Sequence, residues 1–141
     1  MAEQHNTLSS IGLGALLPAV VLGIAASAPL VNDQFITPVD GRLLTLGWWF
    51  MVPLGTALAI MRSRRLWTGF VVGAWSVLAF NLSMMLLAPA TERGAMLGSA
   101  ATWITALVTV VVPWAIGMVL GWTSVEHQAR RLDGTTTPGA A

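Results

Sequence analysis

Four long stretches of this 141-residue sequence contain no charged residue and no histidine. They are Ile11–Leu30, Leu43–Met61, Leu66–Leu87 and Ser99–Trp122. A helix of about 20 apolar residues, rising about 1.5 Å per residue, is long enough to cross a hydrocarbon core of roughly 30 Å. The sequence therefore predicts an all-α integral membrane protein with four transmembrane helices.

Most of the chain belongs to these spans. We expect a tail over residues 1–10, one membrane domain over 11–122, and a second tail over 123–141 that continues the last helix to Arg131 and then becomes disordered. Charged residues make up 9% of the chain, whereas soluble domains carry about 25%.

Ala26–Ala28 resembles a signal-peptide cleavage site, but residues 1–10 contain no Arg or Lys and Pro29 follows. We therefore expect the first span to be a retained helix.

The arginines predict how the chain is oriented. Five of the seven basic residues lie in the link between the second and third spans or in the C-terminal tail, namely Arg62, Arg64, Arg65, Arg130 and Arg131. The other two loops hold only Arg42 and Arg93. Because cytoplasmic loops are enriched in Lys and Arg, both termini are expected in the cytoplasm, with the short connections giving an antiparallel bundle. All seven Lys and Arg positions are Arg, and this bias, with abundant Ala and Gly, indicates a GC-rich bacterial genome. We therefore expect the membrane to be a bacterial inner membrane.

Small residues form one narrow face on three spans when each is projected at about 100° per residue. The helix-packing candidates are Gly12, Ala19 and Gly23 in the first span, Gly69 and Gly73 in the third, and Gly117 and Gly121 in the fourth. Small residues let helix backbones approach closely, and in lipid this packing drives association. These faces either build the protein's own bundle or, for a face such as Gly117 and Gly121, dock on another subunit.

Three polar groups inside the spans need partners. An Asn81 amide facing lipid would leave its donors and acceptor unsatisfied at a cost of roughly a few kcal/mol. Its partner is another span, another subunit or a bound molecule. Trp75 and Trp114 lie at similar depth in the third and fourth spans, where they either pack in the core or hold a flat ligand between them. A lipid, quinone or pigment contact at Asn81, Trp75 and Trp114 follows as a hypothesis.

The spans contain none of the usual chemical groups of an enzyme or metal site. Cysteine is absent, and His5 and His127 lie in the tails, so we expect no cofactor bound through His or Cys. We also expect no metal site and no catalytic residue, because no cluster of carboxylates or imidazoles is present. The Glu92–Arg93 pair in the third loop is interpreted as a solvated ion pair. The scattered arginines do not form a nucleic-acid surface.

The sequence resembles no known family by its motifs. Small multidrug transporters have a similar length and number of spans, but they depend on a glutamate in the first helix, and Ile11–Leu30 has none. The predicted function is a non-catalytic accessory subunit of a larger bacterial inner-membrane complex of respiratory or photosynthetic type, with other membrane subunits and lipids as partners. The alternative is a small homo-oligomeric carrier of an uncharged or lipophilic compound. A membrane enzyme acting through Asp33, Asp40 and Glu92 is a third hypothesis.

Overall fold

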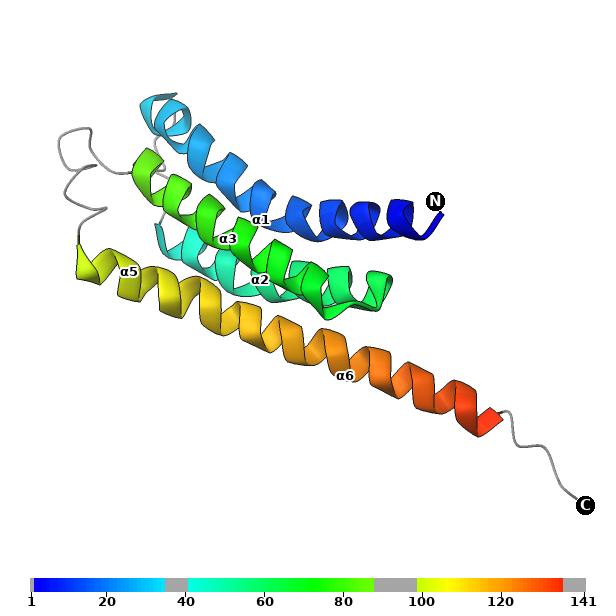
Figure 1. The fold of residues 1–141 in the computed structure, drawn as a ribbon. Helices are drawn as coiled ribbons and strands as arrows, with labels where there is room; N and C mark the ends of the chain where they lie inside the picture. Colours follow the sequence, from blue (N-terminus) through cyan, green and yellow to red (C-terminus); the bar gives the residue numbers. More distant parts are fainter. Residues whose placement is uncertain (1, 35–40, 88–98, 136–141) are drawn as a thin grey trace, which may run out of the picture.

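The computed structural model describes residues 2–34, 41–87 and 99–135. These residues form α1 (Ala2–Gln34), α2 (Gly41–Ser63), α3 (Leu66–Leu87) and a continuous rod made of α5 (Ala100–Ala106), the π-helical η1 (Leu107–Val111) and α6 (Val112–Thr135) (Figure 1). Four helices in the described part are long and apolar enough to cross a membrane. This confirms the prediction of an all-helical chain with the pattern of a multi-pass membrane protein.

The first and last helices extend beyond the predicted spans. α1 begins at Ala2, so residues 2–10, which precede the first predicted span, are also helical. α6 runs to Thr135, past the expected end at Arg131. The rest of the expected disordered end, residues 136–141, lies outside the described residues, as does the Glu92–Arg93 pair.

α2 is the central helix. It packs against α1, α3 and α6, and α1 also packs against α3. A Cβ built on Gly117 would meet Pro53, and one on Gly121 would meet Ala57. Residue numbers therefore rise in the same direction along α2 and α6. Close contact between helices at glycines is the packing expected in lipid. The hydrophobic effect does not drive helices together there, and van der Waals contact between closely spaced backbones does.

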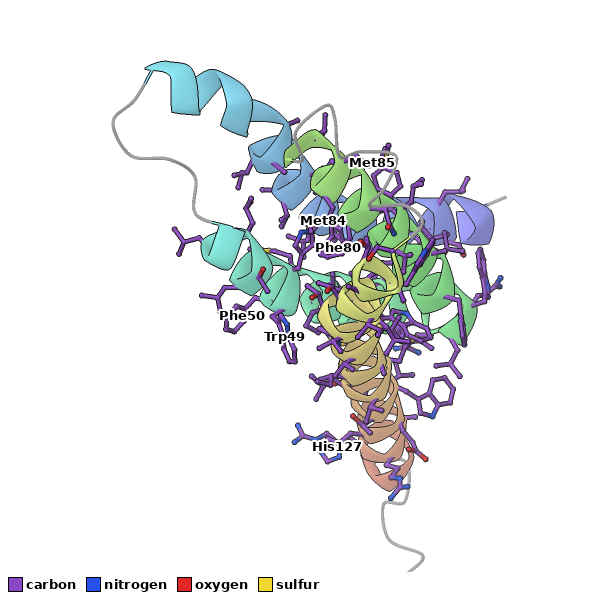
Figure 2. The ribbon with its side chains drawn as sticks, turned by 90° about the vertical axis from the view of Figure 1, so that its left-hand side faces the viewer. Trp49, Phe50, Phe80, Met84, Met85 and His127 are labelled. Carbon is purple, nitrogen blue, oxygen red and sulfur yellow. The ribbon has the colours of Figure 1, made fainter. Side chains whose placement is uncertain are left out.

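The apolar core lies where α1, α2, α3 and the rod meet. Trp48 and Phe80 are buried there, with ring centroids 5.6 Å apart and an interplanar angle of 79°. The next two residues of α2, Trp49 and Phe50, are 38% and 68% exposed and point away from the neighbouring helices (Figure 2). Large apolar side chains on the outside of a helical protein are suited to contact with lipid.

A tight link joins α2 to α3. Arg64 has φ of 56°, in the left-handed region, and its N–H donates to the Ile60 carbonyl at 2.7 Å. The Arg65 N–H donates to Ser63 Oγ at 3.2 Å. Ser63 Oγ and Thr68 Oγ1 lie 2.8 Å apart, so one hydroxyl donates to the other. These bonds pair backbone and side-chain groups where one helix ends and the next begins. At this end of the molecule α6 continues past the other helices (Figure 1).

Candidate functional site

A groove runs between α3 and the rod formed by α5, η1 and α6. It consists of a cavity of about 240 Å³ lined by Phe70, Gly73, Ala74, Val77, Val110, Val111 and Trp114, and of one of about 360 Å³ lined by Ala74, Val77, Leu78, Asn81, Leu82, Met85 and Trp103. Because the two cavities share Ala74 and Val77, they form one continuous apolar groove. We call it the α3–rod groove.

The groove exists because α3 touches the rod far less extensively than α2 does. Its rod side includes the π-helical segment Leu107–Val111. The Val112 N–H donates to the Leu107 carbonyl, five residues back, instead of to the residue four back. Pro113 follows at once and has no N–H to donate, so the regular helical bonding is interrupted at this point. Single π turns of this kind are frequent at functional sites.

Trp114 lies at the end of the groove that contains Phe70. Its Nε1 donates to the Gly69 carbonyl oxygen at 2.9 Å, and its ring meets that of Phe70 edge-on, with centroids 5.3 Å apart. A Cβ added at Gly73 would overlap the indole of Trp114. Gly69 and Gly73 therefore create the space into which the rod places Trp114 and Met118, whose sulfur lies close to Gly69.

Trp75 lies on another side of α3. Its Nε1 donates to the Ala15 carbonyl oxygen of α1 at 3.1 Å, and it is not among the residues that line the α3–rod groove. Trp75 and Trp114 therefore do not lie together in the α3–rod groove. Each indole N–H instead bonds a helix backbone, as buried indoles usually do.

Asn81 lies in the part of the groove nearest α5, where it is half-buried. Its Nδ2 donates to the Val77 carbonyl of its own helix at 2.8 Å. Among the residues that the structure describes, nothing donates to its Oδ1. An amide has two donor hydrogens and an acceptor oxygen, so Asn81 retains hydrogen-bonding capacity toward the groove.

The small-residue faces divide into two groups. Gly69, Gly73, Gly117 and Gly121 lie in helix contacts, where an added Cβ would meet a neighbouring helix. Gly12 and Gly23 are exposed, and no atom of the described residues lies within 4 Å of a Cβ built at either position. Ala19, on the same face, is partly exposed.

The face that α1 buries is a different one. It contains residues on a neighbouring stripe of the helix, namely Thr7, Ser10, Gly14, Pro18, Val21 and Ala25. Gly14 is its closest point of contact with α2. The sequence projection singled out the small residues of α1 but not this stripe, in which Gly14 is the one glycine.

The described residues contain no group of three or more His, Cys, Asp or Glu side chains that could hold a metal ion. The α3–rod groove therefore offers apolar surface, two indoles and one amide. No family model, curated protein or solved structure matches this chain.

Proposed function

We propose that this chain is a non-catalytic accessory subunit of a larger bacterial inner-membrane complex, of respiratory or photosynthetic type. The observation that carries the proposal is the outward small-residue face of α1, defined by Gly12, Ala19 and Gly23. Gly12 and Gly23 have open space where a neighbouring helix would fit. Among the residues that the structure describes, none covers Gly12 or Gly23 on this face.

The spacing of this face suits a partner helix. Gly12 and Ala19 are seven residues apart, and Gly23 follows four residues later, so all three fall on one side of α1. Leu8 and Leu16 flank the face and are 70% and 57% exposed. A helix of a partner subunit could bring its backbone close to the glycines while the leucines pack against its sides.

The orientation is part of the proposal. The α2–α3 link and the C-terminal end of α6 carry the five arginines Arg62, Arg64, Arg65, Arg130 and Arg131. Since α2 and α6 run in the same direction, these arginines gather at one end of the helices. With spans that cross the bilayer alternately, the positive-inside rule assigns this end and both termini to the cytoplasm.

The α3–rod groove supports a lipid, quinone or pigment contact within the same assembly. Asn81 would bond a polar group of such a molecule, and Trp103 and Trp114 would contact its apolar part. Trp75 would act indirectly, by holding α3 against α1 through its bond to Ala15.

Site-directed cross-linking in native membranes tests the subunit proposal. The chain has no cysteine, so a single Gly12→Cys variant presents one thiol on the α1 face. Ile24→Cys is the matched control, because Ile24 is 46% exposed but lies about 120° around the helix from Gly12. A thiol-attached photo-cross-linker is expected to give an adduct with a different protein from Gly12→Cys and not from Ile24→Cys. Adducts with lipid alone from both variants would refute the proposal.

A homo-oligomeric carrier of an uncharged or lipophilic compound is the second candidate. The α3–rod groove favours it, because an apolar groove with a single amide could admit such a compound. In the same cross-linking experiment, an adduct of two copies of this chain from Gly12→Cys would favour the carrier over the accessory subunit. Flux of an uncharged solute through vesicles containing the purified chain would then test transport directly.

A further inference from the structure

Asn81 is the one amide side chain in the four uncharged stretches of the sequence. Its Nδ2 donates one hydrogen to the Val77 carbonyl, and its second hydrogen and its Oδ1 have no partner among the described residues. Asn81 precedes the end of α3 at Leu87 by six residues, or about 9 Å along the helix axis. Because water is scarce at this depth, the amide needs a partner inside the membrane.

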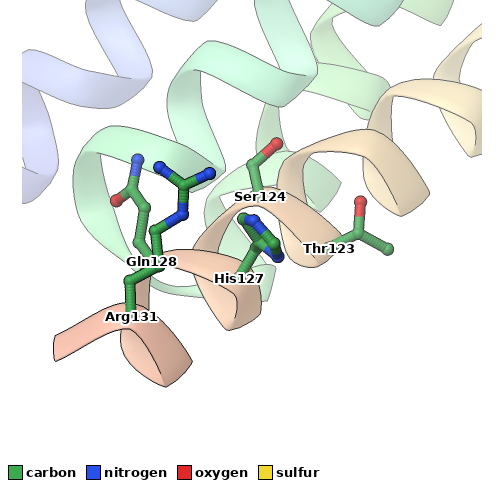
Figure 3. A pocket seen from close by; sticks show the side chains of 5 residues that line it. All are labelled: Thr123, Ser124, His127, Gln128 and Arg131. Carbon is green, nitrogen blue, oxygen red and sulfur yellow. The ribbon is translucent and has the colours of Figure 1, made fainter. Parts of the chain in front are cut away.

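The polar side chains at the end of α6 are in a different situation. A cavity of about 510 Å³ there is lined by Thr123, Ser124, His127, Gln128 and Arg131 (Figure 3). Ser124 Oγ donates to the Leu120 carbonyl at 2.7 Å, and Arg131 already interacts within the chain. The cavity also follows the uncharged stretch that ends at Trp122, so water can bond its remaining groups. Of the two sites, Asn81 is the one that needs a partner in the apolar interior.

Asn81 belongs to a regular outward face of α3. This face consists of Trp67, Val71, Ala74, Leu78, Asn81 and Met85, and we call it the α3 seam. Its members are alternately four and three residues apart, which is the spacing of residues along the contact line of two supercoiled helices. The first four members are exposed, with Leu78 at 54%, and the last two are half-buried. In the described structure the seam is accessible to a further helix.

A second face of α3 has the same spacing and does pack against other helices. It consists of Gly69, Val72, Ser76, Ala79 and Ser83, which are alternately three and four residues apart and are all buried within the chain's own bundle. The spacing of the α3 seam is therefore one that this helix already uses for helix contact. The seam differs in being open and in carrying an amide.

A second copy of the chain supplies the partner that Asn81 needs. Two copies inserted in the same orientation are related by a two-fold axis perpendicular to the membrane. Their α3 helices therefore run parallel, and each seam residue faces its own counterpart. Because an amide has both donor and acceptor groups, the two Asn81 side chains can donate to each other. A single polar residue in an apolar seam also fixes the register of the two helices.

We propose that this chain forms a parallel homodimer along the α3 seam, with the two Asn81 amides hydrogen-bonded to each other. The dimer goes beyond the proposed function, because it uses α3 and not the α1 face of Gly12 and Gly23. Asn81 then bonds the second copy in place of a lipid, quinone or pigment, since it cannot bond both at once. A bound molecule is confined to the cavity at Phe70 and Trp114.

Disulfide cross-linking in native membranes tests the seam. The chain has no cysteine, so Leu78→Cys in the full-length chain places one thiol on the seam. Phe50→Cys is the matched control, because Phe50 is exposed on α2. Phe50 lies 13 residues before the end of α2 at Ser63 and Leu78 lies 12 residues after the start of α3 at Leu66, so the two thiols have similar depth.

Oxidation with copper phenanthroline is expected to link most Leu78→Cys chains into dimers and few Phe50→Cys chains. Equal cross-linking of the two variants would mean random collision and would overturn the seam. Absence of a dimer from Leu78→Cys would also overturn it. Neither result would decide the subunit proposal, which is tested at Gly12 on another helix.

The affinity of the dimer in lipid vesicles tests the amide pair. The chain has no lysine, so donor and acceptor dyes can be attached at the N-terminal amine, and energy transfer is measured over a range of protein-to-lipid ratios. Asn81→Leu should weaken the dimer about fivefold, the loss expected for hydrogen bonding between membrane helices. Asn81→Gln, which keeps an amide, should recover part of the affinity.

Unchanged or tighter association of Asn81→Leu would show that the amides do not pair. The proposal would then be overturned, and Asn81 would be left to a bound molecule. A wild-type chain that is monomeric at every protein-to-lipid ratio would overturn it as well. Circular dichroism would verify that each variant is as helical as the wild-type chain.

Discussion

Gly14 and Gly55 bring the backbones of α1 and α2 into direct contact. A Cβ built on Gly14 would lie 2.6 Å from the Gly55 carbonyl oxygen and 2.9 Å from the Ala59 Cβ, and one built on Gly55 would meet the Gly14 carbonyl. Neither backbone can move without separating the helices. This crossing therefore depends on the absence of a side chain at both positions.

Gly14→Ala is expected to destabilise the chain. The added methyl group would collide with backbone atoms rather than with a flexible side chain, and overpacking of this kind costs about 1–3 kcal/mol. Gly12→Ala is the control, because nothing lies within 4 Å of a Cβ at Gly12. The free energy of unfolding, measured by SDS titration of the purified chain in mild detergent, should fall for Gly14→Ala and stay within about 0.5 kcal/mol for Gly12→Ala. Equal stability of the two variants would contradict the close crossing.

Removing the indole N–H of Trp114 should loosen α3 from α6. In Trp114→Phe the Gly69 carbonyl loses the bond that Nε1 donates at 2.9 Å, and hydrogen bonds between membrane helices contribute about 1 kcal/mol. Trp122→Phe, at an exposed tryptophan of the same helix, should have little effect. The two unfolding free energies measured in the same detergent provide the comparison. If the unfolding free energy falls more in Trp122→Phe than in Trp114→Phe, the Trp114 hydrogen bond does not hold α3 against α6.

Two buried threonines should respond in opposite directions to replacement by valine. Thr56 is fully buried, and its Oγ1 has no hydrogen-bond partner in the described part of the chain. Thr68 is equally buried, but its Oγ1 donates to the Arg65 carbonyl at 2.7 Å or bonds Ser63 Oγ at 2.8 Å. Because valine has nearly the same shape without the hydroxyl, Thr56→Val should raise the unfolding free energy by about 1 kcal/mol and Thr68→Val should lower it by a similar amount.

Thermal unfolding followed by circular dichroism would check the two signs. A loss of stability in Thr56→Val would indicate that its hydroxyl makes a bond in the membrane that the described structure does not contain. An unchanged Thr68→Val would indicate that the Ser63–Thr68 contact does not stabilise the α2–α3 link.

The spans could be predicted from the sequence because the signal for them is local. An uncharged stretch of sufficient length must satisfy its backbone internally in lipid, and a helix does so without help from the rest of the chain. The length of α1 could not be predicted in this way. Polar residues such as Glu3 and His5 precede its apolar part. These residue types do not indicate that the helix begins at Ala2.

The face by which each helix packs depends on its neighbour, and this information is not local. In α1 the projection favoured Gly12, Ala19 and Gly23, whereas the buried stripe includes Gly14 because Gly55 and Ala59 of α2 offer a matching surface. Packing of Gly12 and Gly23 against another chain stays a prediction. In α3 the partners are likewise side chains of other helices, namely Met118 of α6 and Ile60 of α2 at Gly69 and Trp114 of α6 at Gly73.

The candidate site was partly accessible from sequence. Asn81 stood out because an amide is rare and costly in an apolar span, and the structure places it in the α3–rod groove. The groove itself depends on the spacing between α3 and the rod and on the π turn at Leu107–Val111. Pro113 marks that interruption in the sequence, but a proline inside a membrane helix more often produces a simple bend.

Arg64 provides a last prediction, at the link between α2 and α3. Its φ of 56° places a residue with a Cβ in the left-handed region, which costs about 1 kcal/mol and favours glycine. Arg64→Gly should therefore be more stable than Arg64→Ala by about 1 kcal/mol, since both variants remove the same charge and differ in the Cβ. The comparison uses the unfolding free energies of the two variants in one detergent. If Arg64→Ala is as stable as Arg64→Gly, the link does not hold residue 64 in a left-handed conformation, and α2 must end in another way.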